Sequence, residues 1–182
     1  MSLLALLLAL ADAPIPLDPG TWWEYRESYS VPSGELDLIT DDVTRFTITG
    51  PPGRPFVLQT GGADPASAPV ERGDGWIRLG PWTGEEALPL PLQVGRQGPA
   101  AGGVERWRVE GEEEIAAPAG SFRALRCAIR TPSSVSVLWI APGTGVVKET
   151  QGVPGRRPEI ERVLLRWSGA QGSSPAAAPP RR

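Results

Sequence analysis

Histidine is absent from these 182 residues, and cysteine, lysine and methionine occur once each. Without histidine the chain lacks the commonest general base, proton shuttle and metal ligand. A single cysteine, Cys127, cannot form an internal disulfide or a thiolate metal cluster. Catalysis would have to rely on paired carboxylates, a Ser–Lys pair or Arg and Tyr chemistry. We therefore predict a protein that is not an enzyme and that needs no cofactor.

An excess of positive charge is also missing. The chain has 18 basic and 21 acidic residues and a formal net charge of −3. This balance gives no reason to expect a nucleic-acid partner. The only lysine, Lys148, stands beside Glu149, and we interpret the two as an ordinary ion pair on the surface.

Long helical stripes are absent as well, and 22 glycines and 21 prolines break the chain into short pieces. What remains is a series of alternating or apolar runs bounded by Gly/Pro turns. The runs that we interpret as strands include 21–31, 35–50, 56–60, 70–79, 104–115, 122–131, 135–140, 146–150 and 160–167. They predict an all-β fold: one strongly curved antiparallel meander of about 9–11 strands. Such a sheet forms a half-barrel or an open barrel, with no substantial helix in the body.

Alternation assigns faces to several strands. Trp23, Tyr25 and Tyr29 share one face of the first strand, and Trp107 and Trp139 also lie on apolar faces. These five rings are candidates for lining a ligand site on the concave face, although plain core packing explains them too. Residues 135–140 are apolar on both faces, which predicts a strand that is central or covered. In 160–167 we expect Val163, Leu165 and Trp167 to point inward.

The two ends of the chain differ from the body. The run 3–11 is short and wholly apolar, and small residues and a proline follow it, as in a secretory signal peptide. The alternative is an apolar N-terminal helix that is retained. Residues 168–182 are small, polar and Pro-rich, which predicts a disordered tail. We expect a signal peptide over 1–13, one β domain over 14–167, and no membrane-spanning segment in the mature chain.

Three short motifs could be mistaken for sites. The tripeptide from Arg72 to Asp74 matches the integrin-recognition sequence, but Gly-Asp-Gly between two short strands predicts a hairpin turn. The acidic run 112–114 lies on a strand, where consecutive side chains point to opposite faces. Asp37, Asp41 and Asp42 lack the spacing of a calcium loop. We predict no metal site.

The most patterned stretch is 117–150, where Pro118, Gly120, Pro142, Gly143 and Gly145 shape two turns between three strands. Its segments PAGSFRALR (118–126) and WIAPGTGVVKE (139–149), together with LDPGTWWEYRE (17–27), resemble bacterial envelope proteins similar to the TapB and DUF3108-like families. Those families are β-rich and are compared with the LolA/LolB half-barrel of lipoprotein carriers. The resemblance implies an exported protein, periplasmic or extracellular, built on a half-barrel.

Two functions remain open. The first is a module that binds an apolar or lipid ligand on the concave sheet face. The second is an interaction or assembly module of the envelope, which acts on a partner protein through sheet edges or the C-terminal tail. The sequence does not distinguish them, and it does not indicate the oligomeric state.

Overall fold

The computed structural model describes residues 15–33, 36–51, 55–61, 66–83, 87–99 and 106–168. The predicted signal peptide lies outside the described residues, and so does the tail from residue 169. Over the described residues the structure contains twelve strands and one short helix. They are β1 (Trp22–Ser33), β2 (Leu36–Thr49), β3 (Phe56–Thr60), β4 (Ser67–Gly73), β5 (Trp76–Leu79), α2 (Gly80–Thr83), β6 (Ala87–Pro89), β7 (Gln97–Pro99), β8 (Arg106–Ala117), β9 (Gly120–Arg130), β10 (Val135–Ala141), β11 (Gly145–Gly152) and β12 (Ile160–Trp167).

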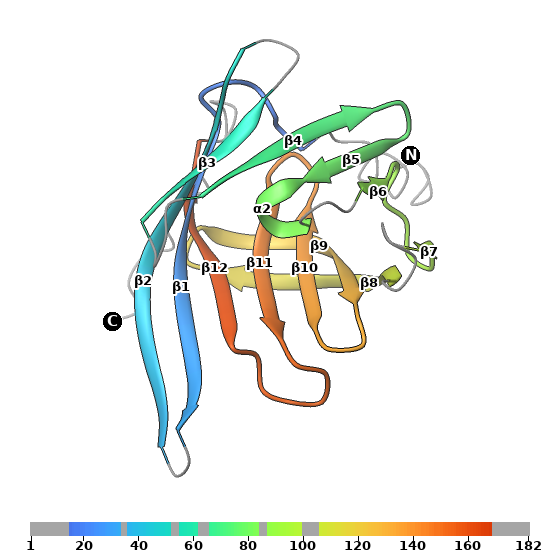
Figure 1. Cartoon of the computed structure of the whole chain (residues 1–182). Coiled ribbons are helices and arrows are strands. Elements are labelled where there is room, and N and C mark those ends of the chain that lie inside the picture. The colour runs from blue at the N-terminus through green and yellow to red at the C-terminus, as the bar shows by residue number, and fades with distance from the viewer. Residues whose placement is uncertain are drawn as a thin grey trace, which may run out of the picture.

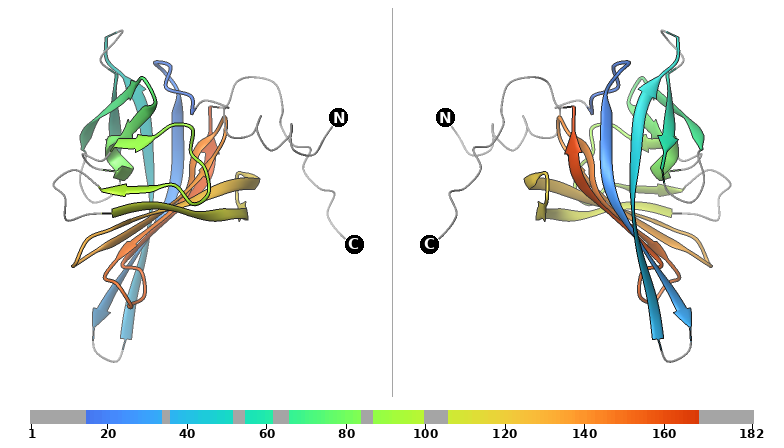
Figure 2. Two further views of the ribbon diagram at one scale, coloured as in Figure 1. Left: turned by 90° about the vertical axis from the view of Figure 1, so that its right-hand side faces the viewer. Right: turned by 90° about the vertical axis from the view of Figure 1, so that its left-hand side faces the viewer.

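All strands join one antiparallel sheet in the order β6-β5-β4-β3-β2-β1-β12-β11-β10-β9-β8-β7. Strands that follow one another in sequence pair, except β6 and β7, and β1 also pairs with β12. The sheet does not close, because β6 and β7 form its two edges. It curves until β8 and β9 run across the direction of β1 and β2 (Figures 1 and 2). The predicted curved meander is confirmed, with one strand more than the upper expected number.

The turns fall where glycine and proline predicted them. Asp74 and Gly75 connect β4 to β5, so the integrin-like tripeptide forms a hairpin. Pro118 and Ala119 connect β8 to β9, and residues 142–144 connect β10 to β11. Gly143 and Gly145 have φ of 72° and 101°, a region that side chains rarely enter. A Cβ on Gly145 would also lie 3.3 Å from Nε1 of Trp23.

Burial follows the expected alternation in most strands. The strand β10 is central and is buried on both faces over much of its length, which confirms the prediction for residues 135–140. One expectation was wrong. In β12 the buried side chains are Arg162 and Leu164, with 8% and 0% exposed, while Val163, Leu165 and Trp167 are only half-buried. The prediction failed because it assigned Arg162 to solvent, whereas Arg162 pairs with two buried carboxylates.

Candidate functional site

An aromatic cluster fills the upper part of the concave face. The helix α2 lies on this side of the sheet (Figure 1) and carries Trp82. The Trp82 ring lies with its centroid 4.9 Å from that of Phe46, 5.8 Å from Trp23 and 6.2 Å from Tyr25. All four rings are between 0% and 4% exposed. Side chains that expose so little surface leave no room beside them for a water-sized group, so this region is packed core.

Two of the candidate rings are held by backbone carbonyls. Nε1 of Trp23 donates to the Thr144 carbonyl at 2.6 Å, and the Tyr25 hydroxyl donates to the Val146 carbonyl at 2.7 Å. Burial raises the pKa of Tyr25 well above its ordinary value, and the nearby charge of Glu149 adds to the rise although Arg162 opposes it. Tyr25 is therefore a neutral donor that fixes the start of β11.

Below the aromatic cluster, one row of cross-strand neighbours is almost wholly buried. We call it the buried row: Val109, Cys127, Leu138, Glu149, Arg162 and Glu27. Every member is 0% exposed except Arg162. Cys127 packs here as a small apolar residue, as expected, and burial raises the pKa of its thiol to about 12.

Arg162 joins the two carboxylates of that row. Its Nη2 donates to Oε1 of Glu27 at 2.7 Å, and its Nη1 donates to Oε2 of Glu149 at 2.8 Å. The Thr44 hydroxyl donates to the other oxygen of Glu27, and the Gln151 amide donates to the other oxygen of Glu149. All four carboxylate oxygens are thus occupied, and the network joins β1, β2, β11 and β12.

The two carboxyl groups have opposite pKa shifts. Burial raises the pKa of Glu149, and the attraction of Arg162 does not fully offset it. Burial acts on Glu27 in the same sense, but its hydrogen bonds with Arg162, Thr44 and Tyr29 outweigh it and lower the pKa of Glu27 below its ordinary value. Burial lowers the pKa of Arg162, but the two carboxylates outweigh burial and raise that pKa above its ordinary value, so the guanidinium stays charged.

The next row toward the lower end of the sheet is more exposed. We call it the rim row: Trp107, Ile129, Ser136, Gln151, Ile160 and Tyr29, each a cross-strand neighbour of the next. It shares the concave face with the buried row and lies two residues away from it along each strand. Trp107 and Ile129 are 8% and 7% exposed, and the other four are half-buried. Two of the five predicted rings, Trp107 and Tyr29, therefore lie at the two ends of this row.

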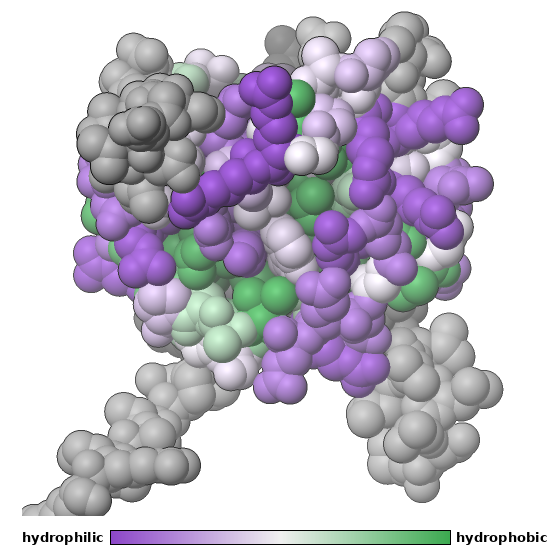
Figure 3. Space-filling view, turned by 90° about the horizontal axis from the view of Figure 1, so that it is seen from below, coloured by the Kyte–Doolittle hydropathy of each residue, from purple (hydrophilic) through white to green (hydrophobic). Residues whose placement is uncertain are grey.

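A pocket of about 210 Å³ opens at the middle of the rim row. Ser136, Gln151 and Ile160 line it. The remaining lining residues, at the adjoining strand ends and loops, are Ser133, Ser134, Val135, Gly152, Val153 and Glu159. The Ser136 hydroxyl is buried without a partner among the described residues, and Gln151 connects the pocket to Glu149. Figure 3, the view onto this end of the molecule, shows apolar side chains between polar ones.

Trp139 lies on the opposite face. Its cross-strand neighbours are Arg126 and Lys148, whose charged groups are 5.7 Å and 5.3 Å from its ring centroid. Its Nε1 donates to Glu113 at 2.8 Å. The structure thus brings Trp23 and Tyr25 together in the packed core, places Tyr29 and Trp107 at the rim, and separates Trp139 from all four.

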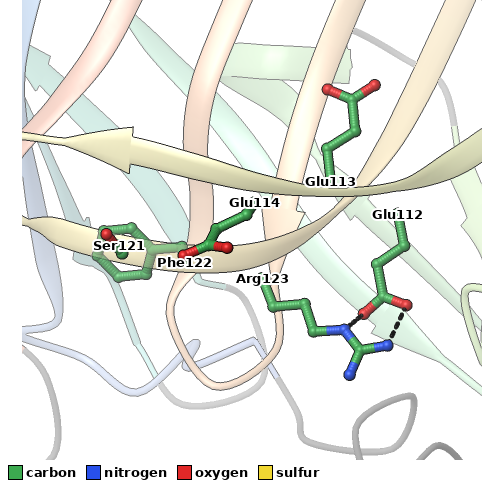
Figure 4. Close-up of a pocket in the computed structure, with 6 residues that line it drawn as sticks. All are labelled: Glu112, Glu113, Glu114, Ser121, Phe122 and Arg123. Atoms are coloured by element: carbon green, nitrogen blue, oxygen red, sulfur yellow. Dashed lines mark hydrogen bonds and ion pairs between the residues drawn. The ribbon is translucent and has the colours of Figure 1, made fainter.

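The acidic run 112–114 borders a second hollow, of about 370 Å³, on the β8–β9 hairpin (Figure 4). Glu112 pairs with Arg123, whereas Glu113 points to the other side of the hairpin. All three glutamates are exposed, which confirms a solvated acidic segment. No group of three or more metal-binding side chains occurs among the residues that the structure describes.

The predicted Lys148–Glu149 surface pair was wrong. Glu149 is fully buried on Arg162, and Lys148 instead pairs with Glu161 at 2.8 Å. Sequence reasoning also missed Glu27, although it alternates in register with Trp23, Tyr25 and Tyr29. A carboxylate on an otherwise aromatic face is a signal for a buried charge, and the same signal existed for Arg162 between apolar neighbours.

No protein-family model and no curated protein matches the chain. Two solved structures share its fold. A Bacteroides fragilis protein assigned as exported, with a YmcC-like fold, has a TM-score of 0.52 at 14% identity and covers 85% of this chain and 98% of that chain. A Parabacteroides distasonis protein assigned as a lipoprotein has a TM-score of 0.53 at 15% identity, with 85% and 97% covered.

A weaker likeness exists to Pseudomonas aeruginosa MucB in its complex with MucA. Its TM-score is 0.43 at 15% identity, and the match covers 93% of this chain and 57% of that chain. In the described part of the chain, no helix has the length and apolar character that crossing a bilayer requires.

Proposed function

We propose that the protein is an exported, non-catalytic binding protein of the bacterial envelope, which holds the apolar part of an amphiphilic ligand at the rim row. The folded body would extend over 14–167. Export is supported by the apolar run at the start of the sequence and by the shared fold of the two structures named above. The observation that carries the binding proposal is the pocket at the rim, beside a packed upper face.

The contrast between the aromatic cluster and the rim row selects the place where a ligand could bind. Trp23, Tyr25 and Phe46 expose 0–1% of their surface, so a ligand cannot reach them without displacing Trp82. The rim row, by contrast, keeps surface exposed on four of its six side chains. A pocket of about 210 Å³ is smaller than those that enclose whole drug-sized ligands, so it would take only one part of a larger molecule.

The lining indicates the kind of ligand. Val135, Val153 and Ile160 offer apolar surface, while Ser136 and Gln151 offer a hydroxyl and an amide at the base. A buried hydroxyl without a partner is costly, and a polar ligand group that displaces the atoms covering Ser136 would satisfy it. A short acyl chain next to an ester, amide or hydroxyl group has this combination.

Catalysis is not supported at the buried row. Its carboxylates are the paired groups that a hydrolase would need, but each oxygen already accepts a hydrogen bond and no side-chain surface is exposed. A reacting group could not approach either carboxylate. We assign the network to holding the four strands together beneath the rim.

The alternative, an interaction module acting through sheet edges, is less favoured. The edge strands β6 and β7 have three residues each. Leu90 donates its N–H to Gly75 of the neighbouring turn, so Pro89, one residue away, faces the free edge without a donor. Little backbone is left there for an added strand to pair with.

Titration with a fluorescent fatty acid tests the binding site. We expect saturable binding by the wild type and at least a tenfold loss in Ser134→Trp, which places an indole at the mouth of the pocket from an exposed loop position. Ser121→Trp, also exposed but on the β8–β9 hairpin, should bind as the wild type does. Absence of binding, or equal loss in both variants, would refute the site. Fractionation of cells that produce the full chain tests export separately.

A further inference from the structure

The convex face of β8 and β9 carries a compact group of guanidinium groups. We call it the arginine block: Arg106, Arg108, Arg126 and Arg130. Arg106 stands directly opposite Arg130, and Arg108 stands opposite Ala128, between Arg126 and Arg130 on the neighbouring strand. Like charges placed directly opposite each other destabilise a sheet. The block therefore weakens the fold unless something of negative charge compensates for it.

Carboxylates of the described residues compensate for only half of the block. Glu110 pairs with both Arg126 and Arg130, and Arg126 also lies 3.7 Å from Glu113. Arg106 and Arg108 are exposed, and no carboxylate among the described residues lies within ion-pair distance of either. Because the chain as a whole is negative, this is a local reversal of sign.

The surface beneath the charges is apolar. Ala128 and Val137 are cross-strand neighbours on this convex face, yet they are 0% and 7% exposed. Arg108, Arg126 and Arg130 flank Ala128 on β8 and β9, and the Arg126 guanidinium lies over the Trp139 ring on the same face. Arginines in this arrangement suit a boundary between apolar and charged layers.

We propose that the arginine block docks the protein on the phosphate headgroups of an anionic lipid surface. Guanidinium groups bind phosphate oxygens in pairs, and a phosphate beside Arg106 and Arg108 would relieve their repulsion with Arg130. The exposed glutamates at 112–114 follow on the same hairpin, so the basic area is only a few headgroups wide. That confinement disfavours a long polyanion, which needs an extended basic track. The biological setting rests on the proposed export, but the surface itself is independent of the rim row.

Vesicle co-sedimentation tests the proposal with the purified full chain. We expect binding to vesicles of phosphatidylcholine with phosphatidylglycerol, loss of that binding at high salt, and no binding to phosphatidylcholine alone. Each Arg removed near an anionic surface should weaken binding about fivefold, so Arg106→Ala/Arg108→Ala should weaken it about thirtyfold. Arg26→Ala/Arg156→Ala, which removes two exposed arginines elsewhere, should have the wild-type affinity.

Failure to bind the anionic vesicles overturns the proposal, and so does an equal loss in the two double variants. Binding to heparin without binding to vesicles would also overturn it, because the partner would then be a soluble polyanion. Fatty-acid titration of Arg106→Ala/Arg108→Ala should give the wild-type result. A loss there would show that the fold was damaged, and Arg106→Gln/Arg108→Gln, which keeps most of the side-chain stem, would then decide by the same vesicle assay.

Discussion

Replacing Arg162 by methionine removes the charge that holds two buried carboxylates. The side chain is only 10% exposed and makes two charge-assisted hydrogen bonds, at 2.7 Å and 2.8 Å. Removing one partner of a buried ion pair costs about 3–5 kcal/mol, because the charge left behind cannot reach water. Here Glu27 and Glu149 would both be left, so we expect a loss of unfolding free energy at the upper end of that range. Methionine keeps most of the volume, which limits the contribution of a cavity.

Urea unfolding followed by tryptophan fluorescence measures this loss. For a slope of about 2 kcal/mol per M, a loss of about 4–5 kcal/mol should lower the midpoint by roughly 2–2.5 M. Arg166→Met is the matched control, since Arg166 lies on the same strand and pairs with Glu24 at 2.6 Å but is 69% exposed. It should leave the midpoint nearly unchanged, because exposed ion pairs contribute little.

Charge, rather than shape, should explain the effect. Adding Glu27→Gln and Glu149→Gln to Arg162→Met removes the unpaired carboxylates and should recover a large part of the lost stability. A shift of the midpoint in Arg162→Met no larger than that in Arg166→Met would contradict an unpaired buried charge. Further destabilisation of the Arg162 variant by the two glutamine substitutions would contradict it too.

Three further predictions concern the same region. Burial raises the pKa of Glu149 above its ordinary value of 4.5. The stability that Glu149 contributes is therefore fully present below pH 4.5 and is lost as the pH rises through the raised pKa. Glu149→Gln should remove this loss, which urea midpoints measured across pH would show. The lowered pKa of Glu27 has the opposite sign, so acid unfolding at still lower pH should persist in Glu149→Gln. Trp82→Ala should cost about 3–5 kcal/mol of unfolding free energy, while Trp82→Phe should cost less because the indole N–H has no partner among the described residues; equal costs would contradict the packing described.

The sheet could be predicted because its signals are local. Period-two alternation and Gly/Pro turns determine each strand and its neighbour, and a meander needs little else. The run 56–60 matches β3, and 160–167 matches β12. What these local signals did not reveal is the pairing of β1 with β12, which joins residues far apart in the sequence.

The site could not be predicted in the same way. Alternation assigned Trp23, Tyr25, Tyr29 and Trp107 to apolar faces, but it could not show that Trp82 fills one end of the concave face and leaves the other open. It also treated charges as solvent-facing, and Arg162 and Glu149 are the exceptions. Their burial depends on partners from other strands, and only the register of β11, β12 and β1 brings those partners together.

The most direct test of the proposed function is mass spectrometry of small molecules released from the protein after native purification from cells that produce the full chain. We expect an amphiphile with an apolar chain, present on the wild type and on Ser121→Trp and lost from Ser134→Trp. A wild-type protein that carries no such molecule, or a Ser134→Trp variant that carries the same amount, would contradict binding at the rim row.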